Sequence, residues 1–62
     1  MYNVIKQEAP DRWVKEIYFQ TEFRAYLYAL TKSKALTATY MVVDTETNEV
    51  TSIVHHGKPL IA

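Results

Sequence analysis

The side chains that could do acid–base or metal chemistry in this sequence include two adjacent histidines. His55 and His56 follow a segment with strand character, so their side chains should point to opposite faces of a sheet. Neither has a further histidine, cysteine or carboxylate nearby at a spacing typical of metal ligands. We therefore expect ordinary strand-end histidines rather than a metal site or a general base.

A second group of candidate residues is formed by the carboxylates of Asp44, Glu46 and Glu49. Paired carboxylates can hold a hard cation or take part in general acid–base catalysis, but both roles need a concave and partly dry site. The surrounding sequence predicts a hairpin tip, which is convex and hydrated. We therefore expect these carboxylates to be solvated turn residues.

The sequence lacks the residues that phosphate binding and nucleophilic catalysis require. Its one glycine, Gly57, cannot form a glycine-rich phosphate loop. Ser33 and Ser52 have no glycine elbow around them, and there is no cysteine to act as a nucleophile or a zinc ligand. We predict a non-enzymatic protein that uses no cofactor and no metal.

Basic and aromatic residues come together at Arg24, Tyr28, Lys32 and Lys34. Aromatic side chains next to cations can stack nucleic-acid bases and hold phosphates. However, Glu22 shares this segment, and seven basic residues balance seven acidic ones, so the chain has no net positive charge to attract a polyanion. A nucleic-acid-binding domain is therefore the alternative hypothesis.

The strongest indication of function is an excess of large apolar and aromatic residues. The 62 residues are 48% hydrophobic and include five tyrosines, two phenylalanines and one tryptophan. One helix can cover only one face of a sheet, so the other face keeps some of these residues exposed, and exposed apolar patches usually mark contact surfaces. The predicted interface residues are Trp13, Ile17, Met41, Val43, Ile53, Leu60 and Ile61.

The helix expected to cover the sheet lies within residues 19–31. Thr21 is a suitable N-cap, because its hydroxyl can accept a hydrogen bond from a free N–H group in the first turn. No glycine marks the other end, which we expect to fade over residues 31–34. The stripe expected to be buried has the i, i+3, i+4, i+7 spacing of one helix face and consists of Phe23, Tyr26, Leu27 and Leu30.

Two segments with strand character precede the helix. Residues 2–6 are rich in β-formers, and residues 7–11 should form a loop because Pro10 cannot donate to a sheet. Residues 13–19 fit a strand, with a short helix as the alternative. As a strand, this segment places on one face Trp13, Lys15, Ile17 and Phe19.

Residues 36–43 and 49–56 form the clearest hairpin in the sequence, and two registers fit them. A three-residue loop with Asn48 in the left-handed region pairs Thr45 with Glu49. A four-residue loop shifts this pairing by one residue. We prefer the first register because it separates apolar from polar residues better. Its core face carries Leu36, Ala38, Tyr40, Val42, Val50, Ser52 and Val54.

These elements predict a single domain of the α+β class over residues 1–62, with residues 57–62 as a C-terminal tail beyond the last strand. The order is ββαββ, which gives a four-stranded antiparallel sheet with one helix packed across one face. An antiparallel arrangement requires the spatial order 2-1-3-4 or 1-2-4-3, and the sequence does not select between them.

The function expected from the sequence is a small protein-interaction module, acting as a regulator or inhibitor of bacterial or phage type. It would dock on another protein through its aromatic and apolar sheet face or through an edge strand. A short chain buries a limited core, so we also expect self-association, with a homodimer favoured. A structural component of a larger assembly is the second alternative. Without a membrane-spanning stretch or a signal peptide, the expected location is the cytoplasm.

Overall fold

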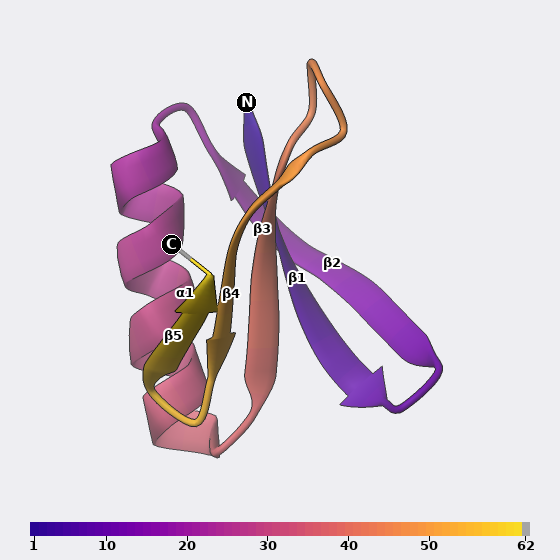
Figure 1. Ribbon diagram of the computed structural model, residues 1–62, viewed down its shortest axis with the longest axis vertical. Coiled ribbons are helices and arrows are strands. Elements are labelled where there is room, and N and C mark those ends of the chain that lie inside the picture. Colours follow the sequence, from indigo (N-terminus) through magenta and orange to yellow (C-terminus); the bar gives the residue numbers. More distant parts are fainter. Residues whose placement is uncertain (62) are drawn as a thin grey trace.

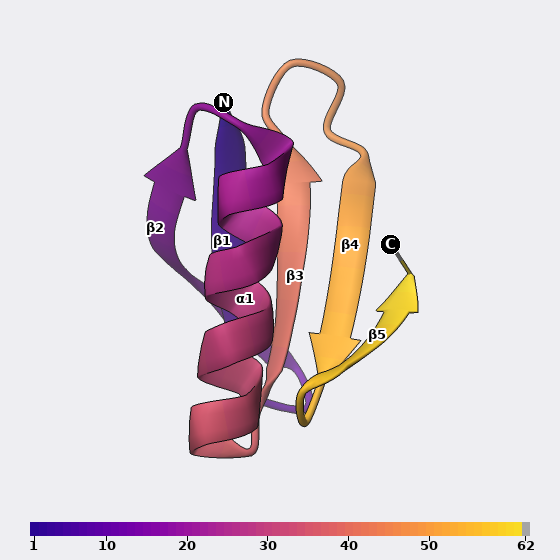
Figure 2. The ribbon, with the colours of Figure 1, turned by 90° about the vertical axis from the view of Figure 1, so that its left-hand side faces the viewer.

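The computed structural model describes residues 1–61, which form one helix and a five-stranded antiparallel sheet with the strand order β2-β1-β3-β4-β5. The helix α1 lies over one face of the sheet, in front of β1 and β3 in Figure 2. No other described segment lies over the opposite face (Figure 1). The elements are β1 (Tyr2–Ala9), β2 (Arg12–Phe19), α1 (Glu22–Leu36), β3 (Thr39–Asp44), β4 (Val50–His55) and β5 (Lys58–Ile61).

The predicted α+β class, with one helix packed on an antiparallel sheet, is confirmed, but the sheet has five strands rather than four. The first four strands have the order 2-1-3-4, and β5 extends the sheet beyond β4. The prediction of a tail over residues 57–62 is therefore wrong for residues 58–61, and residue 62 lies outside the described residues. His56 and Gly57 have φ angles of 51° and 81°, and positive φ at both positions is typical of a type I′ two-residue turn. Gly57 thus joins two strands.

The turn between β4 and β5 is fixed to the C-terminal part of α1. The Gly57 N–H group donates to Ser33 Oγ at 3.0 Å, and Ser33 Oγ donates to the Leu30 carbonyl at 2.9 Å. Ser33 is fully buried. A Cβ atom at Gly57 would lie 3.0 Å from Lys34 Cβ, so both the positive φ and the close approach require glycine here.

The helix begins as predicted but ends later. Thr21 is the N-cap, with its Oγ1 accepting from the Arg24 N–H group at 3.3 Å. The helix continues past residues 31–34 to Leu36, which we had placed in the third strand. Thr37 ends it in the left-handed region with a φ of 52°, so β3 begins at Thr39.

The buried face of α1 also differs from the prediction. Ala25, Ala29 and Ser33 are fully buried against the sheet. Phe23 and Leu27, by contrast, are 68% and 42% exposed, and the other two members of the predicted stripe are only partly buried. Small residues on the helix leave room for larger side chains of the sheet, because the core is filled to a fixed packing density. The core cluster consists of Val4, Ala25, Ala29, Tyr40, Val42 and Val54.

The β3–β4 hairpin combines the two registers that we considered. Over residues 39–42 the pairing is that of the preferred register. Thr51 then has no partner, and this bulge shifts the pairing by one residue toward the turn. As a result, Val50 lies opposite Val43, so it is not on the predicted core face and is 42% exposed. Asn48 takes the left-handed conformation as predicted, with a φ of 60°.

The β1–β2 hairpin contains a bulge as well. β2 is a strand and not the alternative short helix, and β1 extends into the segment predicted as a loop. Glu16 has no partner in β1, which breaks the simple alternation predicted for β2. Lys15 lies opposite Ile5, whereas Ile17 lies opposite Val4. Paired residues share a face, so Ile17 belongs to the α1 side of the sheet.

Candidate functional site

The face of the sheet opposite α1 carries a row of apolar side chains across four strands. Ile5 lies opposite Met41, Met41 opposite Ile53, and Ile53 opposite Ile61. Met41 alternates along β3 with the buried residues Tyr40 and Val42, which face α1, so the row points away from the helix. Neighbouring strands are only about 4.8 Å apart, which makes the row continuous. We call these residues, Ile5, Met41, Ile53 and Ile61, the apolar row.

Further apolar residues flank the apolar row on the same face. Val43 and Val50 lie opposite each other on the side of the β3–β4 turn. Trp13 lies opposite Gln7 near the β1–β2 turn and is 39% exposed. Tyr18 lies opposite Asn3, which also pairs with Val43, and it is 53% exposed on this face. Together with the apolar row, these residues form what we call the open face: Ile5, Trp13, Tyr18, Met41, Val43, Val50, Ile53 and Ile61.

The structure brings together five of the seven predicted interface residues on the open face, whereas Ile17 lies on the other side of the sheet and Leu60 lies at an unpaired position of β5. Ile17 is excluded because its partner, Val4, is buried beneath α1. Leu60 has no partner in β4 and is exposed on the edge strand β5. The predicted residues that lie on the open face are Trp13, Met41, Val43, Ile53 and Ile61.

Sequence reasoning missed three residues of the open face, and one of them, Tyr18, was assigned to the other side of its strand from Trp13 because the bulge at Glu16 was not foreseen. Ile5 lies in a short N-terminal strand, and only its pairing with Met41 shows which face it occupies. Val50 was assigned to the core because the bulge at Thr51 was not foreseen. Strict alternation of apolar residues was the only available signal, and a bulge removes it.

Cations lie at both lateral edges of the open face. In β2, Lys15 lies opposite Ile5, and its Nζ is 5.5 Å from the centroid of the Tyr18 ring. In β5, Lys58 lies opposite His55. His55 in turn lies opposite Thr39, next to Met41 on the same face. The apolar row therefore runs between a lysine on β2 and a lysine on β5.

None of the seven acidic residues occupies a strand position on the open face. Asp44 lies opposite Tyr2 and Glu8 pairs with Lys6, in both cases on the α1 side of the sheet. Glu16 also turns toward α1. The remaining acidic residues lie in turns or at the start of α1 and are Asp11, Glu22, Glu46 and Glu49.

The Glu16 carboxylate connects β2 with the helix and the core. The hydroxyl group of Tyr28 donates to it at 2.5 Å, and that of Tyr40 at 3.3 Å. The hydrogen bond to Glu16, together with burial, raises the pKa of Tyr28 to about 12. Burial, together with the Glu16 charge, raises the pKa of Tyr40 to about 12. Both tyrosines therefore remain protonated donors near neutral pH, and their hydrogen bonds to Glu16 join β2 to α1 and β3.

The basic and aromatic residues predicted as a nucleic-acid patch are only partly brought together. Arg24, Tyr28 and Lys32 follow a spacing of four along α1, and Lys32 Nζ is 5.8 Å from the centroid of the Tyr28 ring. Lys34 lies apart from them, beside the β4–β5 turn. The Glu16 carboxylate at the Tyr28 hydroxyl places a negative charge within the patch. This negative charge weakens the attraction between the patch and the phosphates of a nucleic acid.

A second apolar surface lies on the outer side of α1. Because Phe23 and Leu27 are not buried, they line a shallow hollow of about 530 Å³ between α1 and the end of β2. Phe19 and Tyr28 complete its apolar wall, and their ring centroids are 5.4 Å apart. Arg24 lies at its rim. This hollow is smaller in extent than the open face and is confined to one helix and one strand end.

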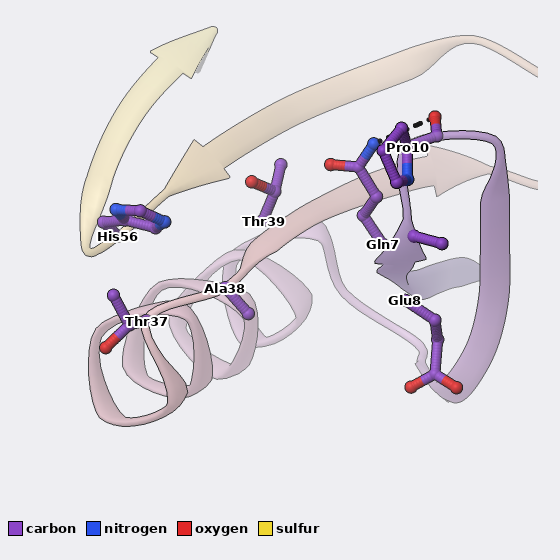
Figure 3. Close-up of a pocket in the computed structure, with 8 residues that line it drawn as sticks. Gln7, Glu8, Pro10, Thr37, Ala38, Thr39 and His56 are labelled. Carbon is purple, nitrogen blue, oxygen red and sulfur yellow. Dashed lines mark hydrogen bonds between the residues drawn. The ribbon is translucent and has the colours of Figure 1, made fainter.

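A polar hollow of about 310 Å³ lies between the β1–β2 turn and the segment after α1 (Figure 3). Glu8 and His56 lie at opposite ends of it in Figure 3. The rings of His55 and His56 stack with their centroids 3.7 Å apart, instead of pointing to opposite faces as predicted, because His56 belongs to the turn. Within residues 1–61, no three histidine, cysteine or carboxylate side chains gather in an arrangement that could hold a metal ion.

Within the described residues, no helix is long and apolar enough to cross a membrane. The chain matches no protein-family model, no curated protein and no solved structure.

Proposed function

We propose that this chain is a small non-enzymatic protein-interaction module that docks its open face on another protein. The observation that carries the proposal is the apolar row. Ile5, Met41 and Ile53 lie side by side on the three inner strands of the sheet, with no described segment above them. Covering such a surface removes apolar area from water, which favours association by about 25 cal/mol per Å².

The open face suits protein contact better than the hollow beside α1. It extends over the sheet from β2 to β5, and its backbone is held by strand pairing. Trp13 and Met41 are of residue types that are enriched at protein interfaces. A role as a regulator or inhibitor of bacterial or phage type is supported by the small size and the composition of the chain.

The test is capture of partners from an extract of the source organism on three immobilised proteins: the wild type, Met41→Glu and Phe23→Glu. Met41→Glu places a charge in the apolar row, whereas Phe23→Glu changes an equally apolar residue on the opposite side of the molecule. Circular dichroism first establishes that both variants are folded. We expect a stoichiometric partner that Met41→Glu loses and Phe23→Glu retains. Equal capture by all three proteins would contradict docking through the open face.

Self-association, predicted from the sequence, is tested in parallel by light-scattering mass over a concentration range. A dimer that Met41→Glu dissociates and Phe23→Glu preserves would identify the partner as a second copy. A strictly monomeric protein that also captures no stoichiometric partner would overturn the proposed function.

Nucleic-acid binding is the alternative function, and it rests on the line of Arg24, Tyr28 and Lys32 along α1. It has less support because Glu16 lies within that patch. It requires an affinity for oligonucleotides that falls steeply between about 50 and 200 mM salt. Absence of binding to labelled single- and double-stranded oligonucleotides at low salt would remove it. A structural role in a larger assembly, the second alternative, would use the open face as well.

A further inference from the structure

We infer that the partner of the open face presents an apolar centre with an acidic rim, and that it is not a second copy of this chain. The inference rests on the proposed docking function and names the chemistry of the partner. It comes from the separation of charge between the two sides of the sheet. Lys15 and Lys58 flank the apolar row, while no acidic residue occupies a strand position on the open face.

The cations of the open face have no acidic partners within the described residues. There, the ion pair between Lys6 and Glu8, at 3.7 Å, involves neither Lys15 nor Lys58. Lys15 instead lies over the Tyr18 ring at 5.5 Å, which keeps it beside the apolar row. Carboxylates on a partner would find these ammonium groups available, and charge complementarity of this kind selects partners and speeds association.

His55 adds an imidazole ring to the same rim. Its Nδ1 lies 2.5 Å from Thr39 Oγ1, and its ring stacks on His56. These contacts fix the orientation of the ring beside Lys58. The β5 end of the open face therefore presents a lysine ammonium group beside an oriented imidazole ring.

A second copy of the chain fits this surface poorly. Two open faces stacked on each other would bring together two rims that are both positive. None of the chain's own carboxylates occupies a strand position on the open face, so none lies between these lysines to offset the repulsion. Like charges facing one another across an interface disfavour the pairing. A different protein with acidic residues around an apolar patch avoids this repulsion.

The centre of the open face favours a protein over a nucleic acid. Ile5, Met41 and Ile53 are aliphatic or thioether side chains, which offer no flat ring on which a base could stack. The aromatic residues of the open face, Trp13 and Tyr18, lie at its margin on the edge strand β2, opposite Gln7 and Asn3. Aliphatic side chains pack well against the apolar side chains of a protein.

The test uses three synthetic peptides of identical apolar residues, alternating with Glu, Gln or Lys, titrated into the ¹⁵N-labelled full chain at low salt. We expect the Glu peptide to shift the amide signals of Ile5, Met41 and Ile53 and to bind about tenfold or more tightly than the Lys peptide. Its affinity should fall as salt is added, because exposed charges are screened. The Gln peptide should bind with intermediate affinity.

Matched variants test whether Lys15 and Lys58 cause the preference for the Glu peptide over the Lys peptide. The double substitution Lys15→Glu and Lys58→Glu should reverse the preference, so that the Lys peptide binds more tightly. The control double substitution Lys32→Glu and Lys34→Glu makes the same change of charge on α1 and should leave the preference unchanged. Ile53→Ser, which introduces no charge, should weaken all three peptides by removing part of the apolar row.

The outcomes separate this inference from the proposed function. Equal binding of the Glu and Lys peptides, weakened in both cases by Ile53→Ser, would leave docking intact and overturn the acidic preference. A micromolar dimer dissociated by Ile53→Ser would overturn it in favour of a second copy. A single-stranded oligonucleotide that shifts the open-face signals more strongly than the Glu peptide would overturn it in favour of nucleic acid. Absence of binding by all three peptides would overturn the docking function and the inference together.

Discussion

At the scale of single residues, Gly57 determines whether β5 can join the sheet. Its φ of 81° and the 3.0 Å separation between an added Cβ atom and Lys34 Cβ both act against any other residue. We expect Gly57→Ala to lower the free energy of unfolding by roughly 1–3 kcal/mol, measured by urea denaturation. His56→Gly is the matched control, because it relieves a positive φ in the same turn and should not destabilise the chain. Equal stability of Gly57→Ala and the wild type would show that the turn can rearrange.

Because two tyrosines donate hydrogen bonds to Glu16, the free energy of unfolding should depend on pH in the alkaline range. The pKa values of Tyr28 and Tyr40 are raised from 10.0 to about 12 in the folded chain, so the protonated forms stabilise the fold. This stabilisation is complete below about pH 10, the unfolded value, and is lost as the pH rises from about 10 to 12. Unfolding free energies measured over this range should fall accordingly.

Glu16→Gln tests the origin of this dependence. The substitution removes the negative charge while keeping an oxygen that accepts hydrogen bonds, so the pKa of Tyr28 should move back toward 10.0. Tyr40 should respond less, because burial is the larger cause of its raised pKa. Phenolate absorbance during a pH titration measures both. A titration curve identical to that of the wild type would contradict the role given to Glu16.

At the scale of elements, substitutions on the two sides of α1 should differ in their effect on the free energy of unfolding. Leu27 follows the apolar spacing but is 42% exposed, so Leu27→Ala should cost less than about 1 kcal/mol. Ala29 is fully buried, so Ala29→Leu should cost roughly 1–3 kcal/mol or more by overpacking. Thermal or urea unfolding measures both. The opposite order of effects would mean that the apolar stripe of α1 faces the sheet after all.

The helix and strands could be predicted where local signals agree, and not where tertiary packing decides. The N-cap at Thr21 and the left-handed Asn48 depend on local chemistry, and both are found. The buried face of α1 depends on the volume of the sheet residues beneath it, which favours Ala25 and Ala29 over larger neighbours. Periodicity alone identifies an apolar side of a helix but not the side that packs.

Strand faces were predictable only up to the bulges. Alternation assigns Met41, Val43 and Ile53 correctly because β3 and the end of β4 pair in the preferred register. It fails for Ile17 and Val50, each of which follows or precedes an unpaired residue in its strand. No residue pattern in the sequence marks these unpaired positions, since neither is a glycine. The fifth strand was missed for a related reason: Gly57 signals an interruption without stating whether the chain leaves the sheet or returns to it.

At the scale of the whole molecule, the formal charge is zero, but the charged residues are distributed unevenly over the two faces of the sheet. The balance of seven basic and seven acidic residues argued against a polyanionic partner. Only the strand pairing shows that Lys15 and Lys58 lie on the open face, where no acidic residue occupies a strand position. When a surface is built from residues that are distant in the sequence, its charge depends on which residues the strand order and pairing bring onto it. The apolar part of the site could therefore be predicted from composition, whereas its electrostatic character could not.

The residues of the apolar row should contribute little to the free energy of unfolding of the isolated chain. Met41 and Ile53 are partly exposed, so Met41→Thr and Ile53→Thr exchange partly hydrated apolar residues for a polar β-former and should each cost less than about 1 kcal/mol. Val42 and Val54 alternate with them on the same strands but are fully buried, so a threonine there buries an additional hydroxyl group and should cost roughly 1–3 kcal/mol. Urea denaturation of the four variants measures the contrast. If threonine lowers the free energy of unfolding as much at Met41 as at Val42, the apolar row is part of the folding core. Its apolar composition would then be explained by folding, without a binding partner. If the contrast holds, these side chains add little to folding, and association is the physical role left for them.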